Sequence, residues 1–153
     1  MRVADVMVRD VISVAPETGV QEIARLLWAH AISGVPVVAP DGSVVGIVSE
    51  RDLLVRNANL HVPNYIRVLD AMIPLGDPRD FKEELRRATG AIAADVMTPD
   101  VVAVEPDTDL ADAATLMLDK DVNRLPVIEG GRLVGVISRA DFVRLLAQDI
   151  PTE

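Results

Sequence analysis

Two short segments of the sequence carry a serine followed three residues later by an aspartate, Ser49-Glu50-Arg51-Asp52 and Ser138-Arg139-Ala140-Asp141. An ionised aspartate only accepts hydrogen bonds, so it suits neighbouring hydroxyl groups of a ligand, whereas serine and arginine donate to anionic oxygens. Each serine ends an apolar run and precedes a predicted helix, and free N–H groups at a helix start favour an anion. The two segments are therefore candidate ligand sites.

The same spacing is also typical of a helix cap, with serine as the N-cap residue and the acid in the first turn. Spacing alone favours capping. Because capping and anion binding can share one helix end, both interpretations stay open. Arg51 and Arg139 likewise have a second interpretation, as solvated helix residues.

Other motifs of catalysis are missing from the sequence. Cysteine is absent, which excludes disulfides, thiolate metal sites and cysteine nucleophiles. His30 and His61 have no neighbour at metal-ligand spacing and suggest no Ser-His-Asp arrangement. Neither glycine-rich nucleotide motif, Gly-x-x-x-x-Gly-Lys or Gly-x-Gly-x-x-Gly, occurs. We expect a protein that is not an enzyme and has no catalytic cofactor or metal. A cluster of acids is interpreted as a solvated helix edge, with weak Mg²⁺ contact left open: Asp109, Asp112, Asp119 and Asp121.

The composition of the 153 residues predicts a globular protein, with 50% apolar and 25% charged residues. This excludes intrinsic disorder and supplies a substantial core. The net charge of −9 disfavours nucleic acid as a partner, because it repels a polyphosphate. No apolar run approaches the ~18 residues of a membrane span, and residues 1–5 lack the apolar core of a signal peptide. We expect a soluble cytoplasmic protein.

The sequence repeats itself at an offset of 90 residues. Ala4-Asp5-Val6-Met7 returns as Ala94-Asp95-Val96-Met97, and Pro36-Val37 returns as Pro126-Val127. One residue is then lost in a turn, so the two Ser-x-x-Asp segments lie 89 residues apart. The chain therefore contains two copies of a unit of roughly fifty residues.

Each copy predicts the element order β-α-β-β-α. In the first copy a β-rich run at residues 11–14 precedes an amphipathic helix from Thr18 to about His30, with Gln21 completing a capping box. A hairpin is predicted around Pro40-Asp41-Gly42-Ser43, followed by a second helix. A unit of this size cannot bury both faces of its sheet. The predicted fold class is α/β (α+β), with two pseudo-symmetric units packed sheet to sheet.

The segment between the copies is predicted to be a helical insert that packs on the module's edge or on a second protomer. Residues 64–73 have apolar residues at helical spacing, and a further helix is predicted from Asp77-Pro78 to Arg87. The predicted boundaries are residues 1–56 for the first unit, 57–91 for the insert and 92–153 for the second unit.

The repeated unit resembles the cystathionine-β-synthase (CBS) domain, and the tandem resembles a Bateman module. The resemblance rests on the opening Asp-Val-Met, the Pro-Val strands at Pro36 and Pro126, and the endings Gly46–Asp52 and Gly135–Asp141. It implies a regulatory module that binds an adenosine-containing ligand (AMP, ADP or ATP, sometimes S-adenosylmethionine) in clefts between the paired units. No catalysis is implied.

The resemblance also implies which residues line each cleft. The first implied cleft joins the ending of the second unit to the first unit: Ser138, Arg139 and Asp141 with Ser13, Val14, Ile32 and Ser33. Its pseudo-symmetric counterpart joins the ending of the first unit to the second unit: Ser49, Arg51 and Asp52 with Ala103, Val104, Val122 and Asn123.

Arg124 matches a position at which the family often has a phosphate-facing basic residue. The equivalent place in the first unit is Gly34, so we expect unequal clefts. An ion pair of Arg124 with one of the many carboxylates is the alternative.

The family further implies a homodimer and an unknown effector protein on a separate chain. Trp28 and the methionines are interpreted as core or interface residues. The alternative to a nucleotide sensor is a ligand-free structural dimerisation module that acts through its insert.

Overall fold

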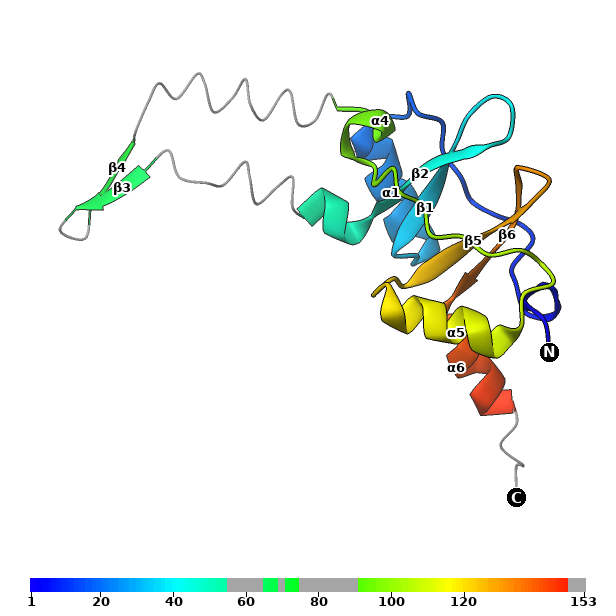
Figure 1. Ribbon diagram of the computed structural model, residues 1–153. Helices are drawn as coiled ribbons and strands as arrows, with labels where there is room; N and C mark the ends of the chain where they lie inside the picture. Colours follow the sequence, from blue (N-terminus) through cyan, green and yellow to red (C-terminus); the bar gives the residue numbers. More distant parts are fainter. Residues whose placement is uncertain (55–64, 69–70, 75–90, 149–153) are drawn as a thin grey trace.

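A computed structural model describes residues 1–54, 65–68, 71–74 and 91–148 of the chain. The first half contains α1 (Val20–His30), β1 (Gly34–Val38) and β2 (Val44–Ser49), followed by helical residues at 50–54. The second half repeats this order (Figure 1): α5 (Leu110–Asp119), β5 (Arg124–Glu129), β6 (Arg132–Ser138) and α6 (Arg139–Gln148).

The two antiparallel hairpins, β1–β2 and β5–β6, lie next to each other at the centre of the molecule, and the helices flank them (Figure 1). Their tips meet where the Leu133 amide donates to the Gly42 carbonyl at 3.4 Å. Gly42 adopts φ 89°, a left-handed conformation that suits glycine in this turn. The fold is α+β, with two pseudo-symmetric units as predicted.

The predicted first strand of each unit is reduced to an isolated β-bridge in the structure. Val14 makes a single parallel bridge to Val37, and Val104 makes the equivalent bridge to Val127. The predicted capping box of the first helix is wrong, because Gly19 is the N-cap residue of α1. The Thr18 hydroxyl instead accepts the Ala15 amide at 3.0 Å, which stabilises the preceding turn.

Each half has its own apolar core. In the first half α1 buries Ile23 and Leu27 against the hairpin, with the strand residues Val35, Val37 and Val48. The second core consists of equivalent residues, among them Ala113, Met117, Leu125, Val127 and Ile137. Trp28 is 89% exposed, so it does not contribute to the core.

The segment that opens each half, residues 3–8 in the first half and 93–98 in the second, packs on the other half. We call these the opening segments and say that they are exchanged. Val3 at the start of the chain, in η1 (Val3–Asp5), is fully buried in the second core, and its amide donates to the Thr108 carbonyl at 2.9 Å. Ala93 in α4 (Ala93–Val96) is buried in the first core, and its amide donates to the Thr18 carbonyl at 2.8 Å. Each core is thus completed by residues from the other copy.

Two glycines make this exchange possible. A Cβ at Gly46 would lie 2.5 Å from the Met97 Sδ, and a Cβ at Gly135 would lie 2.6 Å from the Met7 Sδ. Next to these contacts, Thr98 bridges Ile47 and Val8 bridges Val136, so each opening segment adds a residue pair to the other half's hairpin.

The prediction of a helix at residues 64–73 is wrong. Residues Tyr65–Val68 form β3 and Ala71–Pro74 form β4, an antiparallel pair with Val68 opposite Ala71. Tyr, Ile and Val favour strands, and this preference outweighs apolar spacing that also fits a helix. The second predicted helix, from Asp77 to Arg87, lies outside the described residues. Among the helices that are described, none is long and apolar enough to cross a membrane.

Candidate functional site

The two Ser-x-x-Asp segments line two clefts between the halves. We name the cleft at Ser49 and Asp52 cleft 1 and the cleft at Ser138 and Asp141 cleft 2. Their volumes are about 780 Å³ and about 400 Å³. Both fall in the range of roughly 300–1,000 Å³ that small-molecule sites occupy.

The clefts bring together most of the residues predicted for them. In cleft 2, Ser138, Arg139 and Asp141 lie with Ile32 and Ser33 of the other half. The set predicted for the other cleft lines cleft 1 together with Arg124: Ser49, Arg51, Asp52, Val122 and Asn123.

Four predicted lining residues lie elsewhere. Val14 and Val104 are the bridge residues, and they are buried in the two cores. Ser13 and Ala103, which precede them, are also absent from the cleft walls. The walls use the three residues directly before Ser13 and Ala103: Asp10, Val11 and Ile12 in cleft 2, and Asp100, Val101 and Val102 in cleft 1.

Both Ser-x-x-Asp segments cap the helix that they begin. The Asp52 Oδ2 accepts the Ser49 amide at 2.8 Å and the Ser49 hydroxyl at 3.0 Å. The Asp141 Oδ2 accepts the same two donors from Ser138 at 2.8 Å and 3.0 Å. Each serine hydroxyl thus donates to the aspartate. This hydrogen bond must break before the same hydroxyl can donate to a ligand.

The second oxygen of each aspartate differs between the clefts. The Asp52 Oδ1 accepts the Thr98 hydroxyl at 3.1 Å, whereas the Asp141 Oδ1 pairs with Arg144 at 2.9 Å. A carboxylate offers about four acceptor positions, and three are occupied in each case. Each aspartate therefore retains capacity for one further donor, such as a hydroxyl group of a ligand.

Arg124 joins the two halves beside the clefts. Its Nη1 donates to the Gly34 carbonyl at 2.6 Å and its Nη2 to the Ser33 hydroxyl at 2.6 Å. Burial lowers the pKa of the guanidinium, and the charges of Glu50 and Asp141 oppose that shift. Arginine nevertheless stays charged in proteins.

Among the described residues of cleft 2, Arg139 is the second cation. It pairs with Asp121 at 3.5 Å, and both side chains are well exposed. Such surface pairs contribute only about 0–1 kcal/mol, so Arg139 can turn toward an anion at low cost.

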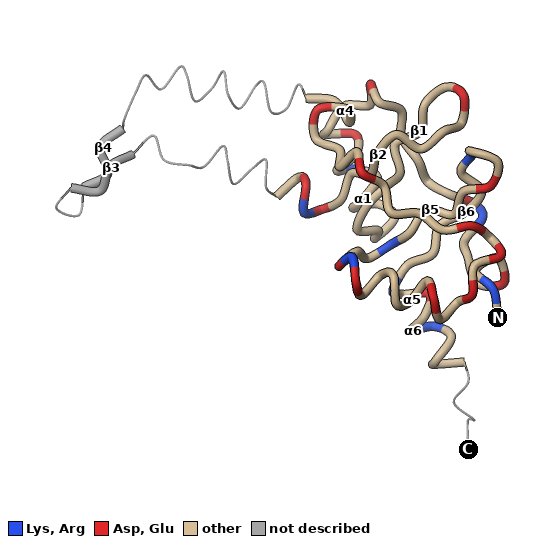
Figure 2. The backbone as a smooth tube through the Cα atoms, in the orientation of Figure 1, with Lys and Arg blue, Asp and Glu red and all other residues tan. Residues whose placement is uncertain are grey.

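The clefts differ in charge. Figure 2 shows that acidic residues are spread over loops and helix ends of both halves. Asp10 and Asp141 balance Arg124 and Arg139 in cleft 2. The described wall of cleft 1 has three cations, Arg51, Lys120 and Arg124, and more carboxylates: Glu50, Asp52, Asp95, Asp100 and Asp121.

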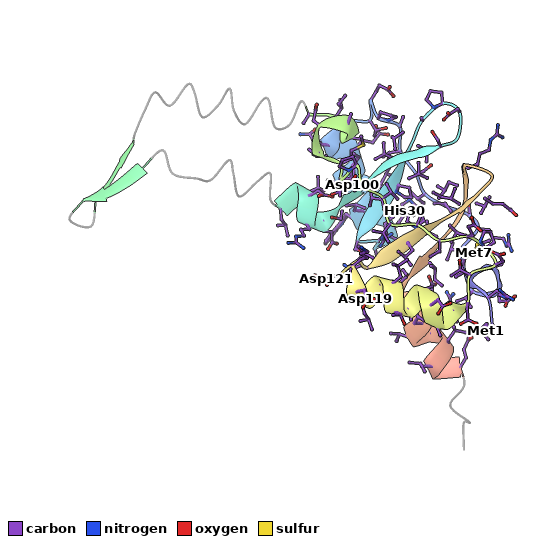
Figure 3. The ribbon with its side chains drawn as sticks, viewed as in Figure 1. Met1, Met7, His30, Asp100, Asp119 and Asp121 are labelled. Carbon is purple, nitrogen blue, oxygen red and sulfur yellow. The ribbon has the colours of Figure 1, made fainter. Side chains whose placement is uncertain are left out.

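The acidic residues of α5 lie at both of its ends. Asp109 caps the helix by accepting the Ala111 amide at 2.9 Å. Asp119 and Asp121 lie at its far end, and Asp100 lies on the segment that follows α4 (Figure 3). Within the described residues no three His, Cys, Asp or Glu side chains are placed to hold a metal ion.

Comparison with known proteins agrees with this architecture. The uncharacterized protein MJ1426 of Methanocaldococcus jannaschii is 32% identical, with 95% of this chain and 91% of that protein aligned. The chloroplastic CBS domain-containing protein CBSX1 of Arabidopsis thaliana is 36% identical over 88% of this chain, which spans 58% of that protein.

Solved structures show the same fold. CBSX2 in complex with AMP superposes with a TM-score of 0.73 at 29% identity, covering 96% of both chains. The CBS domain pair of MJ0100, in complex with 5′-methylthioadenosine and S-adenosyl-L-methionine, has a TM-score of 0.70 at 20% identity and 98% coverage of both chains. The CBS domain model matches residues 3–58 and 93–148. The chain therefore belongs to the CBS domain family and carries two copies of that domain.

Proposed function

We propose that this protein is a regulatory module that binds an adenosine nucleotide, such as AMP, in the clefts between its two CBS domains. One observation carries the proposal: in each cleft the Ser-x-x-Asp helix start of one half meets apolar residues of the other half. The structural similarity to CBSX2, which was solved with AMP, supports the choice of ligand.

Cleft 2 offers a suitable chemical group for each part of AMP. Val11, Ile12 and Ile32 provide an apolar wall for the base. The free acceptor position of Asp141 suits a ribose hydroxyl, and the start of α6 favours the phosphate. Arg139 adds a forked donor for the phosphate oxygens.

A ligand in either cleft contacts both halves, so it can change their relative position. We infer that this change reaches an effector protein on a separate chain. The size of the effect is limited by the ratio of the ligand's affinities for the two arrangements. The cytoplasm, where adenosine nucleotides report energy state, is the proposed location.

A thermal-shift screen tests the proposed ligand class directly. We expect the midpoint to rise with AMP, because a ligand at 100 times its Kd stabilises the folded state by about 2.7 kcal/mol. ADP, ATP, S-adenosylmethionine and NAD complete the screen. No shift with any of them would overturn the proposal and favour the ligand-free structural module.

Asp141→Ala should weaken AMP binding in cleft 2 by about 1–3 kcal/mol, because it removes a charged acceptor. Calorimetric titration measures this loss. Asp109→Ala is the matched control, since it removes a helix-capping carboxylate that lines neither cleft. If both Asp52→Ala and Asp141→Ala bind AMP as tightly as the unmodified chain, the aspartates do not have the proposed role.

We also propose a homodimer. Trp28 on α1 and Leu118 on α5 occupy equivalent places in the two copies, and they are 89% and 74% exposed. Val143 and Leu146 on α6 are exposed as well. Large apolar side chains at equivalent places favour a symmetric partner such as a second copy.

The combined variant Trp28→Asp and Leu118→Asp should convert the dimer to a monomer, because charges would replace apolar contacts at both equivalent places. Light scattering measures the mass. Glu22→Asp, on the same helix as Trp28, serves as a conservative control that should stay dimeric. A variant that remains fully dimeric would exclude these side chains from the interface.

A further inference from the structure

The two clefts share part of their wall. Three residues line both of them: Ser33, Asn123 and Arg124. Arg124 is the cation of this set, and the charges that act on it come from both sides. Glu50 belongs to the wall of cleft 1, and Asp141 belongs to the wall of cleft 2. The guanidinium therefore lies between the two sites.

The pseudo-symmetry of the fold would allow a second basic residue at Gly34, but a side chain there would be crowded by its neighbours. A Cβ at Gly34 would lie 3.0 Å from the Val48 carbonyl oxygen and 3.4 Å from the Arg124 Nε. The first value is tighter than ordinary contact, and the second shows that Arg124 occupies the adjacent space. Of the equivalent positions 34 and 124, only position 124 has an arginine, and this arginine lines both clefts.

The existing hydrogen bonds limit what that guanidinium can offer. The Gly34 carbonyl and the Ser33 hydroxyl each accept a bond of 2.6 Å, one from Nη1 and one from Nη2. These bonds use one N–H group of each terminal nitrogen. Arginine has five N–H groups, so three remain, and a phosphate binds bidentately to a pair of them.

We propose that the clefts compete for Arg124, so that a nucleotide phosphate in one cleft weakens phosphate binding in the other. This inference rests on the proposed function, because it requires nucleotide in both clefts. The first phosphate draws the remaining N–H groups of Arg124 toward its own cleft. The second then meets a partly neutralised cation and a neighbouring negative charge, so its affinity falls.

Plugged variants separate this coupling from an intrinsic difference between the clefts. Val101 lines cleft 1 and Val11 lines cleft 2 at equivalent places, and both are partly buried. Val101→Trp should block cleft 1, and Val11→Trp should block cleft 2. Each full-length variant then reports the AMP affinity of the open cleft with no phosphate in the other one.

Calorimetry with AMP should give one site in each plugged variant and two in the unmodified chain. We expect the second step in the unmodified chain to be 5–150-fold weaker than the same cleft in its plugged variant, the usual range of coupling between sites. Equal affinities, or a tighter second step, would overturn the coupling. Failure of AMP to bind the unmodified chain or either plugged variant would overturn the proposed function instead.

Two further measurements identify Arg124 as the cause. With adenosine, which has no phosphate, the coupling should fall below 2-fold in the unmodified chain. In Arg124→Gln the AMP coupling should fall equally. Coupling that persists with adenosine would show that the clefts communicate by another route. The adenosine experiment needs no substitution, so it remains decisive if Arg124→Gln folds poorly.

Discussion

Val3→Asp should unfold the second half of the protein. Val3 is fully buried among Leu125, Ile137 and other residues that lie more than a hundred positions later in the chain. A carboxylate there has no partner, and a buried unpaired charge costs at least about 4–5 kcal/mol. Urea denaturation followed by circular dichroism measures the loss.

Val8→Asp is the matched control for this substitution, because Val8 belongs to the same opening segment but is 42% exposed. Its cost should stay near 0.5 kcal/mol, as is usual for surface positions. A Val3→Asp protein with the urea midpoint of the unmodified chain would show that the opening segment is not part of the second core.

Gly46→Val should lower the free energy of unfolding by about 1–3 kcal/mol, the usual cost of overpacking. The added Cβ would lie 2.5 Å from the Met97 Sδ and 2.8 Å from its Cγ. Combining it with Met97→Ala should destabilise the protein less than the sum of the two single changes, by about 1–3 kcal/mol. Thermal or urea unfolding of all four proteins gives this coupling energy.

Gly19→Ala provides the control, since a Cβ at Gly19 meets nothing within 4 Å. An alanine in place of glycine at an N-cap changes stability by less than about 1 kcal/mol. Strictly additive effects of Gly46→Val and Met97→Ala would contradict the packing of the second opening segment on the first half.

The duplicated architecture could be predicted because its evidence is local and occurs twice. Both hairpins combine a buried Pro-Val strand with a glycine-containing turn, and the structure has both. The exchange of opening segments could not be predicted. Val3 and Ala93 lie beside their own copies in the sequence, and only three-dimensional packing shows that each completes the other core.

The prediction of a helix at residues 64–73 failed because its apolar pattern is ambiguous. A run of apolar residues at residues 64–73 fits helical spacing, but short runs also fit a strand pair. The β-branched and aromatic residues of Tyr65–Val68 were the signal that favoured β3.

The candidate site was predictable in part. The repeated Ser-x-x-Asp segments and Ser33 line the clefts because the strand-to-helix junctions of both halves face the other half. Val14 and Val104 lie in the cores rather than in the walls, since alternation along an extended segment turns them inward. Asp10-Val11 and Asp100-Val101, which also repeat, were the missed signal. Within the described part of the chain Arg124 bonds to Gly34 and Ser33 rather than to a carboxylate, and neither interpretation of the sequence included this contact.

The exchanged opening segments also determine when each half can fold during translation. The first core lacks Ala93 until that residue leaves the ribosome, and Val3 emerges long before its neighbours near Thr108 and Leu125. The first half is therefore incomplete while it is a nascent chain, so both halves should reach their final structure together, after the second half has been synthesised. Contacts of such long sequence separation are slow to form.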